Sequence, residues 1–355
     1  MTNALEMTGG VVILLVVFVD VFTSVIVPRP TRRAFRPSGI LVRFMWPTWR
    51  SLGLARWLAR RDREGFLGMF APLMVIVGLG LWVVSLVLGF ALLMYAQATS
   101  IHPPLRDFGS AVYFAGTTAL TIGYGDFVPA SLATRLLALL SAGSGLATFA
   151  IVISYLFLLF GAFQRRENFV IVLDGSAGAP PSGVQLLETY RRLGLDFDLP
   201  ALFLRGQRWA ADILETHLAY PILGFFRSSH KDESWIGALG AVLDAATLLV
   251  TTLSVESPTP GQARLMIEVG THLTDDLTNF FRIPRQREAG VERTEFETAR
   301  SRLIAAGYAC RDAEESWLAF RELRAEYASS LNAMARFWAI PPAMWIGDRS
   351  SIARH

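Results

Sequence analysis

The stretch that decides the fold covers residues 107–126 and reads DFGSAVYFAGTTALTIGYGD. Its first part, residues 108–120, is mostly apolar and contains no proline, and Asp107 or Ser110 can cap a helix there. This helix is too short to cross a bilayer, which takes about 20 residues. Residues 121–125 contain two glycines and predict non-helical backbone, which is tolerated at membrane depth only where it is buried or lines a water-filled path. The stretch therefore predicts a re-entrant helix followed by an irregular loop.

Apolar segments lie on both sides of this stretch. Residues 70–96 and 136–163 contain no charged side chain, and each exceeds the about 20 residues that a transmembrane helix needs. A third apolar segment, residues 7–27, has an acidic start and no small-residue cleavage site after it, which predicts a retained helix instead of a signal peptide. This segment contains Asp20, which we expect to pair with an arginine of the following linker. The chain is 52% hydrophobic and 18% charged, which excludes a disordered protein and argues against a purely soluble one.

Residues 121–126, TIGYGD, resemble the signature of potassium channels, TVGYG followed by aspartate. With a short helix before it and an uncharged span on either side, the segment 67–163 is similar to the two-helix pore unit of prokaryotic potassium channels. It departs from the family in three places: Ile122 replaces valine, Leu120 replaces a second threonine, and Thr117 stands where some members have a carboxylate. These departures leave open which hydrogen bonds stiffen the loop.

The resemblance implies that backbone carbonyls replace the hydration shell of K⁺. Consecutive carbonyls can be aimed at one axis only if the backbone alternates unusual dihedral angles, and glycine reaches positive φ at low cost. The short helix directs the negative end of its dipole towards the ion. The residues implied to coordinate K⁺ are Thr121, Ile122, Gly123 and Tyr124, and those implied to support the filter are Gly125 and Asp126.

The signature occurs once in the chain, and one loop supplies only a quarter of a ring. The resemblance therefore implies a homotetramer with fourfold symmetry. The expected partners are potassium ions, membrane lipids and further copies of this chain. We expect no enzyme activity, no cofactor besides the transported K⁺ and no nucleic acid, and the regulatory ligand stays unidentified.

The apolar segment at residues 136–163 contains two glycines near its middle, Gly143 and Gly145. In related channels a glycine at about the position of Gly145 acts as a gating hinge, and the alternative is that small residues let helices pack closely. Further along, four apolar side chains step by four, four and three residues and share one helical face. That face either lines the pore or packs against the span at residues 70–96: Phe149, Ile153, Phe157 and Phe160.

Arginines predict the orientation in the membrane. Residues 28–64 contain ten arginines and two acidic residues, whereas residues 97–135 contain two of each. Because short arginine-rich flanks stay in the cytoplasm, we expect the N-terminus outside and residues 164–355 inside, in the plasma membrane. Residues 40–59 mix tryptophans, leucines and arginines, which is typical of a helix lying in the membrane interface.

Residues 185–355 predict a cytoplasmic α-helical bundle, because many segments carry apolar residues at three- and four-residue steps. Before the bundle, residues 169–173 form a strand-like apolar run. The glycines after it lack the GxGxxG spacing of a dinucleotide site and predict a linker or turn. Residues 236–253 are apolar enough to suggest a span, but Asp244 favours a buried bundle helix. The expected helices cover 182–193, 200–220, 232–254, 261–283, 292–306 and 312–339.

A metal or ligand site in the bundle is the alternative use of this region. Glu268, His272 and Asp276 are four residues apart and share a face, but they lack the paired Glu-x-x-His pattern of bundle metal sites.

The sequence thus predicts an all-α membrane protein with three transmembrane helices, a re-entrant pore helix and a selectivity filter, followed by a cytoplasmic helical bundle. The predicted function is a potassium-selective channel, and the alternatives are a non-selective cation channel or a membrane-tethered enzyme or receptor. The expected division is an N-terminal helix, an arginine-rich interfacial linker, the pore domain, a second linker and the bundle, at residues 1–28, 29–66, 67–163, 164–184 and 185–355.

Overall fold

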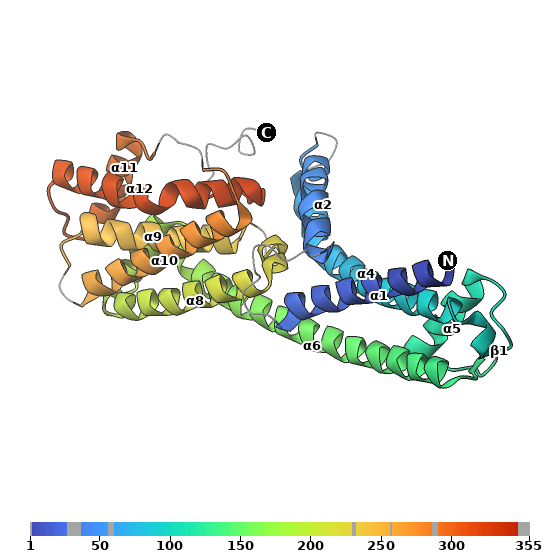
Figure 1. Ribbon diagram of the computed structural model, residues 1–355. Coiled ribbons are helices and arrows are strands. Elements are labelled where there is room, and N and C mark those ends of the chain that lie inside the picture. Colours follow the sequence, from blue (N-terminus) through green and yellow to red (C-terminus); the bar gives the residue numbers. More distant parts are fainter. Residues whose placement is uncertain are drawn as a thin grey trace. The chain divides into compact units, whose positions relative to one another are not determined.

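The computed structural model describes residues 2–26, 37–55, 60–228, 232–255, 258–285 and 290–346. The chain divides into two compact units, residues 1–160 and 161–355 (Figure 1). The predicted fold class is confirmed: within the described residues, three helices are long and apolar enough to cross a membrane, and the C-terminal region is helical.

The first unit contains the apolar helices and a two-stranded sheet. Strands β1 (Ile101–His102) and β2 (Val128–Pro129) pair antiparallel. The helices are α1 (Thr2–Val21, continued by a π-helical turn at Phe22–Ile26), α2 (Pro37–Gly53), α3 (Arg60–Gly68), α4 (Phe70–Tyr95), α5 (Phe108–Ala119) and the first part of α6 (Leu132–Ala177).

Helix α6 is longer than the predicted span and continues into the second unit. Residues 169–173, expected to be strand-like, lie within this helix, so that expectation is wrong. A short apolar run fits a buried strand or a buried helix equally well. Here Val170, Leu173 and Ala177 are buried at helical spacing, and the helix ends only before Gly178, which has φ +80°.

Helices α1 and α4 lie side by side (Figure 1) and their backbones approach closely at two glycines. A Cβ atom on Gly10 would lie 2.8 Å from the carbonyl oxygen of Gly89, so both positions need a small residue. Further along, the buried Asp20 carboxylate accepts a 2.8 Å hydrogen bond from the indole N–H of Trp82. The arginine partner expected for Asp20 belongs to a linker whose residues 29–36 lie outside the described part of the chain.

Helix α2 packs against α3 and the start of α4 through its tryptophans. The rings of Trp46 and Phe70 are 4.9 Å apart, and Trp49 stacks on Phe66 at 4.6 Å and donates to its carbonyl oxygen. On other sides of α2, Phe44 and other apolar side chains are exposed. The helix therefore presents apolar surface next to arginine side chains, as the interfacial prediction requires. Part of that predicted segment, residues 56–59, lies outside the described residues.

The second unit is a helical bundle built around one buried helix. Its helices are α7 (Gly183–Arg192), α8 (Leu199–Ala219), α9 (Trp235–Thr251), α10 (Thr259–Phe281), α11 (Arg293–Ala305) and α12 (Ala313–Phe337). Every residue of α9 is buried, and Figure 1 shows α9 among α8, α10 and α12. The apolar helix of this region is therefore the bundle core that we predict, and it is shorter than the spans of the first unit.

The one charge in α9 is fully paired. One oxygen of the Asp244 carboxylate accepts from the Nε of Arg324 at 2.9 Å and from the hydroxyl of Tyr327 at 2.7 Å. Arg324 also donates to the carbonyl oxygen of Trp345 at 2.7 Å, which ties the end of the chain to the core. A buried carboxylate is tolerable only with such partners.

Replacing this arginine should therefore unfold the bundle readily. We expect Arg324→Met to lower the free energy of unfolding by roughly 3–5 kcal/mol, because it leaves the Asp244 charge buried without its counter-ion. Chemical unfolding of the full-length protein in detergent, followed by circular dichroism, measures the loss. The matched control is Arg321→Met, one turn earlier and exposed, and equal stability of the two variants would contradict the prediction.

Candidate functional site

The site begins with the short helix α5. Its N-cap is Asp107, whose carboxylate accepts from the backbone N–H of Ser110 at 2.7 Å, as predicted. Helix α5 ends close to the expected residue. Its apolar face is buried against α4, in one cluster with residues of that helix: Ala111, Phe114, Ala115 and Ala119. The loop after α5 therefore starts from the end of a helix that is packed firmly against its neighbour.

The backbone of this loop alternates in hand. Thr121, Gly123 and Gly125 have φ of +58°, +58° and +82°, whereas Ile122 and Tyr124 between them have ordinary negative φ. Such alternation turns successive peptide planes the same way, so that consecutive carbonyls can share one side of the chain. Two of the three left-handed positions are glycine, where this costs little. The third, Thr121, is strained by roughly 1–3 kcal/mol and must be held by its surroundings.

Backbone hydrogen bonds tie the loop to the last turn of α5. The carbonyl oxygen of Thr117 accepts from the N–H of Ile122 at 2.8 Å and from that of Gly123 at 3.2 Å. The N–H of Thr121 donates to the carbonyl of Thr118 at 3.0 Å. The first three N–H groups of the loop thus donate to the end of α5. At the position where related channels carry a carboxylate, this chain uses the main chain of Thr117.

Tyr113 is a site residue that sequence reasoning missed. Its ring stacks on that of Tyr124 with centroids 6.5 Å apart and planes 4° from parallel. It also meets Phe127 edge-on at 6.2 Å. The available signal was the spacing, since Tyr113 and Thr117 lie one turn apart on α5 and share a face. The ring of Tyr124, a residue implied to coordinate K⁺, therefore packs against this helix.

The far end of the loop is closed by the small sheet. Beside the β1–β2 pair, the carbonyl oxygen of Ser100 accepts from the N–H of Ala130 at 3.0 Å and from the hydroxyl of Thr134 at 3.1 Å. Thr134 and Ser131 also cap the start of α6 reciprocally. The irregular residues are thus anchored at both ends, by α5 before them and by the hydrogen bonds to the Ser100 carbonyl oxygen after them.

The two predicted hinge glycines have different surroundings. A Cβ atom on Gly145 would overlap the carbonyl oxygen of Ala119, at the base of the loop. Around Gly143 no atom lies within 4 Å of the position of such a Cβ. Gly145 therefore allows α6 to press against the end of α5, which is the close-packing alternative, while Gly143 is unconstrained within the chain.

The predicted pore-lining side chains are exposed in the single chain. Phe149, Ile153 and Phe157 are 65%, 40% and 77% exposed. The face of α6 that meets the rest of the first unit is a different one, where Ile151 and Val152 pack near Trp82. The packing of this part of α6 within the chain is thus carried by other residues.

At its C-terminal end, α6 is anchored in the bundle by Arg166. This side chain is 1% exposed and donates to the carbonyl oxygens of Leu223 and Phe226, both at 2.8 Å. It also pairs with Glu167 at 2.9 Å, and its Nη1 lies 3.3 Å from Nε2 of His217. The anchor thus joins α6 to α8 and to the segment that follows α8.

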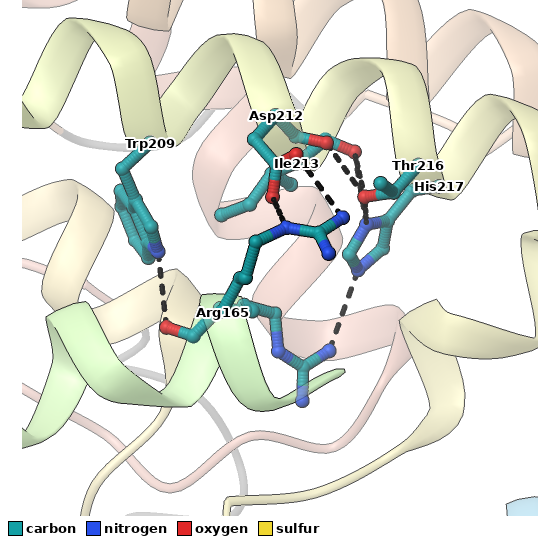
Figure 2. A network of polar contacts seen from close by, with 7 residues as sticks. Arg165, Trp209, Asp212, Ile213, Thr216 and His217 are labelled. Carbon is teal, nitrogen blue, oxygen red and sulfur yellow. Dashed lines mark hydrogen bonds and ion pairs between the residues drawn. The ribbon is translucent and has the colours of Figure 1, made fainter. Parts of the chain in front are cut away.

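Figure 2 shows how α8 meets this end of α6. His217 lies with its Nδ1 2.9 Å from the carbonyl oxygen of Ile213, Arg165 reaches Asp212 at 3.3 Å, and Trp209 donates to the carbonyl oxygen of Arg166. Because a carbonyl only accepts, Nδ1 carries the proton and Nε2 is free to accept from Arg166. Burial, followed by the nearby Arg166 charge, holds the pKa of His217 well below its usual 6.5. The imidazole is therefore neutral.

The residues weighed as a metal site do not gather into one. His272 and Asp276 are 3.5 Å apart and exposed, and within the described residues no three metal-binding side chains form a group, Glu268 included.

Comparison with known proteins agrees with this geometry. Residues 70–161, from the start of α4 to the end of the pore segment of α6, match a protein-family model described as an ion channel. The chain is 24% identical over 244 residues to YdjJ of Bacillus subtilis (strain 168), an uncharacterized membrane protein, over 63% of this chain and 70% of that one. No solved structure matches. The match to an ion-channel family thus falls in the unit that holds the three helices apolar enough to cross a membrane, and it supports ion conduction across a membrane.

The contrast between the two glycines can be tested by adding one methyl group to each. We expect Gly145→Ala to destabilise the protein by about 1–3 kcal/mol through overpacking against Ala119. Gly143→Ala should be neutral or stabilising, because alanine is favoured over glycine within a helix by about 1 kcal/mol. Thermal unfolding of the purified protein in detergent compares them, and equal effects would refute the distinction.

The neutral state of His217 makes bundle stability depend on pH. Its pKa is lower folded than unfolded, so the unfolded chain binds the extra proton. Stability is full above pH 6.5 and falls as the pH drops further, by up to about 1.4 kcal/mol per pH unit. Unfolding series between pH 8 and 5 should show a smaller fall for His217→Gln than for wild type. His102→Gln, at an exposed position of β1, is the control and should behave as wild type.

Proposed function

We propose that the protein is a potassium-selective channel of a prokaryotic plasma membrane, conducting passively through a pore formed by four copies. The observation that carries the proposal is the alternating hand of the loop, with positive φ at Thr121, Gly123 and Gly125. This is the backbone that a row of carbonyl ligands requires, and it occurs in the segment that matches an ion-channel family. A turn that only reversed the chain would not need three left-handed residues in alternation.

Potassium gives up its hydration shell only where oxygens replace it. The carbonyls of residues 121–124, with the Thr121 hydroxyl, would supply successive oxygen rings when four loops surround one axis. The carbonyls are available for this because the bonds that hold the loop to α5 use its N–H groups. Gly125 and Asp126 would close the filter at its outer end, with Tyr113 as the brace.

The gate would lie below the filter, on α6. The exposed side chains Phe149, Ile153 and Phe157 would face the axis and narrow the path, which closes a pore by excluding water from an apolar constriction. Of the two glycines, Gly143 is the better hinge, because its surroundings leave room for movement. Gly145 would hold α6 against the base of the filter.

The orientation that we propose has the N-terminus outside and the bundle in the cytoplasm. It rests on the excess of arginines in residues 28–64, which stay on the inner side. The domain division belongs to the same proposal, with the pore domain at residues 67–163 and the cytoplasmic domain at 185–355. Regulation would enter through that bundle, to which α6 is anchored at Arg166.

Ion flux into liposomes that contain the purified protein tests the proposal. We expect flux of K⁺ to exceed that of Na⁺ by far in the wild type. Gly123→Ala should lower K⁺ flux at least about tenfold, because a side chain at φ +58° costs roughly 1–3 kcal/mol and distorts the filter.

The control is Gly116→Ala, inside α5, where an added Cβ would make only an ordinary 3.7 Å contact with Val87 and should leave flux intact. Equal permeability to Na⁺ and K⁺ would replace the proposal with a non-selective cation channel.

A further inference from the structure

The cytoplasmic end of α6 continues a pattern that starts in its pore segment. Six residues follow one another at steps of three, four, four, three and four, which keeps them on one face of a helix. This face, which we call the α6 stripe, consists of Phe157, Phe160, Gln164, Asn168, Ile171 and Gly175. Because α6 is one helix from Leu132 to Ala177, the stripe runs without interruption past the point where the bundle begins.

The bundle covers the opposite face of this part of α6. Ala162, Arg166, Val170, Leu173 and Ala177 are all buried, at steps of four, four, three and four. The bonds of Arg166 hold that face in place. The bundle of the same chain therefore leaves the stripe uncovered, and Ile171 is 47% exposed although it lies in the helix that carries the bundle.

The stripe carries no charge. Between residues 136 and 177 the charged side chains of α6 are Arg165, Arg166, Glu167 and Asp174, and all four lie off the stripe. A face exposed to water tolerates charges freely. A face that meets identical copies around an axis does not, because each charge would be repeated at short distance from itself. The uncharged amides Gln164 and Asn168 suit such a position, since an amide can donate and accept between copies.

The helix is long enough for its stripe to extend out of the membrane. Its 46 residues span roughly 69 Å at about 1.5 Å per residue, more than twice the about 30 Å of a hydrocarbon core. Residues 136–163 already exceed the length that the hydrocarbon core needs, so the part of the stripe from Gln164 onward lies beyond the lipid. This part consists of two amides, an exposed isoleucine and a glycine, an uncharged face at the three- and four-residue spacing of helix self-association.

We propose that residues 164–175 of α6 form a self-association surface, on which the stripe packs in parallel against the same residues of neighbouring copies. The inference rests on the proposed function, which brings four α6 helices around one axis. It adds that these helices stay together below the membrane as a column. Each bundle is mounted on the outer face of that column through Arg166, so that a rearrangement of the bundle acts on the helices directly beneath the gate.

Disulfide trapping in native membranes tests the surface. Cys310 is the one cysteine in the chain, so Cys310→Ser provides a cysteine-free background. In that background, Ile171→Cys should form disulfide-linked dimers on oxidation with copper phenanthroline. The control is Ser176→Cys, which lies about 140° further round the helix and should give at least tenfold less dimer. Equal dimer yields from the two positions would overturn the inference.

A second variant guards against adventitious cross-linking. Ile171→Arg places one positive charge per copy on the stripe, and it should abolish the dimers formed by Gln164→Cys. The control, Arg321→Met on the exposed face of α12, should leave these dimers unchanged. Persistence of the dimers in Ile171→Arg would contradict the proposal.

Flux assays on the same variants separate this inference from the proposed function. Selective K⁺ flux without cross-linking at residue 171 overturns the column and leaves the channel standing. Cross-linking at residue 171 without selective flux supports self-association and overturns the channel. Loss of both overturns both.

Discussion

The Thr117 carbonyl, with its two hydrogen bonds from the N–H groups of Ile122 and Gly123, is the contact on which the site depends. Inside a membrane every backbone group has to find a partner within the protein. The N–H groups of Thr121, Ile122 and Gly123 find theirs in the last turn of α5, and these bonds do not use the loop carbonyls. The same contact compensates for the left-handed backbone of Thr121, which would not persist in an unsupported loop.

The surroundings of the loop follow from the need to keep this contact in place. Helix α5 is too short to be stable alone, so its apolar face is buried against α4, and its first turn is capped by Asp107. The far end of the loop is held by the Ser100 carbonyl, which accepts from Ala130 and Thr134. Any movement of α6 therefore reaches the loop through Gly145, where helix and loop base are in backbone contact.

Helix α6 belongs to both units, and its two faces differ in their surroundings. One face packs within the chain, near Trp82 in the first unit and inside the bundle in the second. The other face remains uncovered by the chain's own residues and carries no charge beyond residue 136. The ion-channel family match ends at residue 161, close to the point where the second unit starts.

The amino-acid sequence by itself determined the features that depend on local pattern: the apolar spans, the capped short helix, the loop signature, and the helices of the bundle with Asp244 buried among them. These follow from periodicity and from the cost of exposing apolar surface or burying charge. Only the tertiary structure decided the stacking of Tyr113 on Tyr124, the difference between Gly143 and Gly145, the helical state of residues 169–173 and the burial of Arg166. Each of these is set by partners distant in the sequence, and local spacing does not specify which distant residue a side chain will meet.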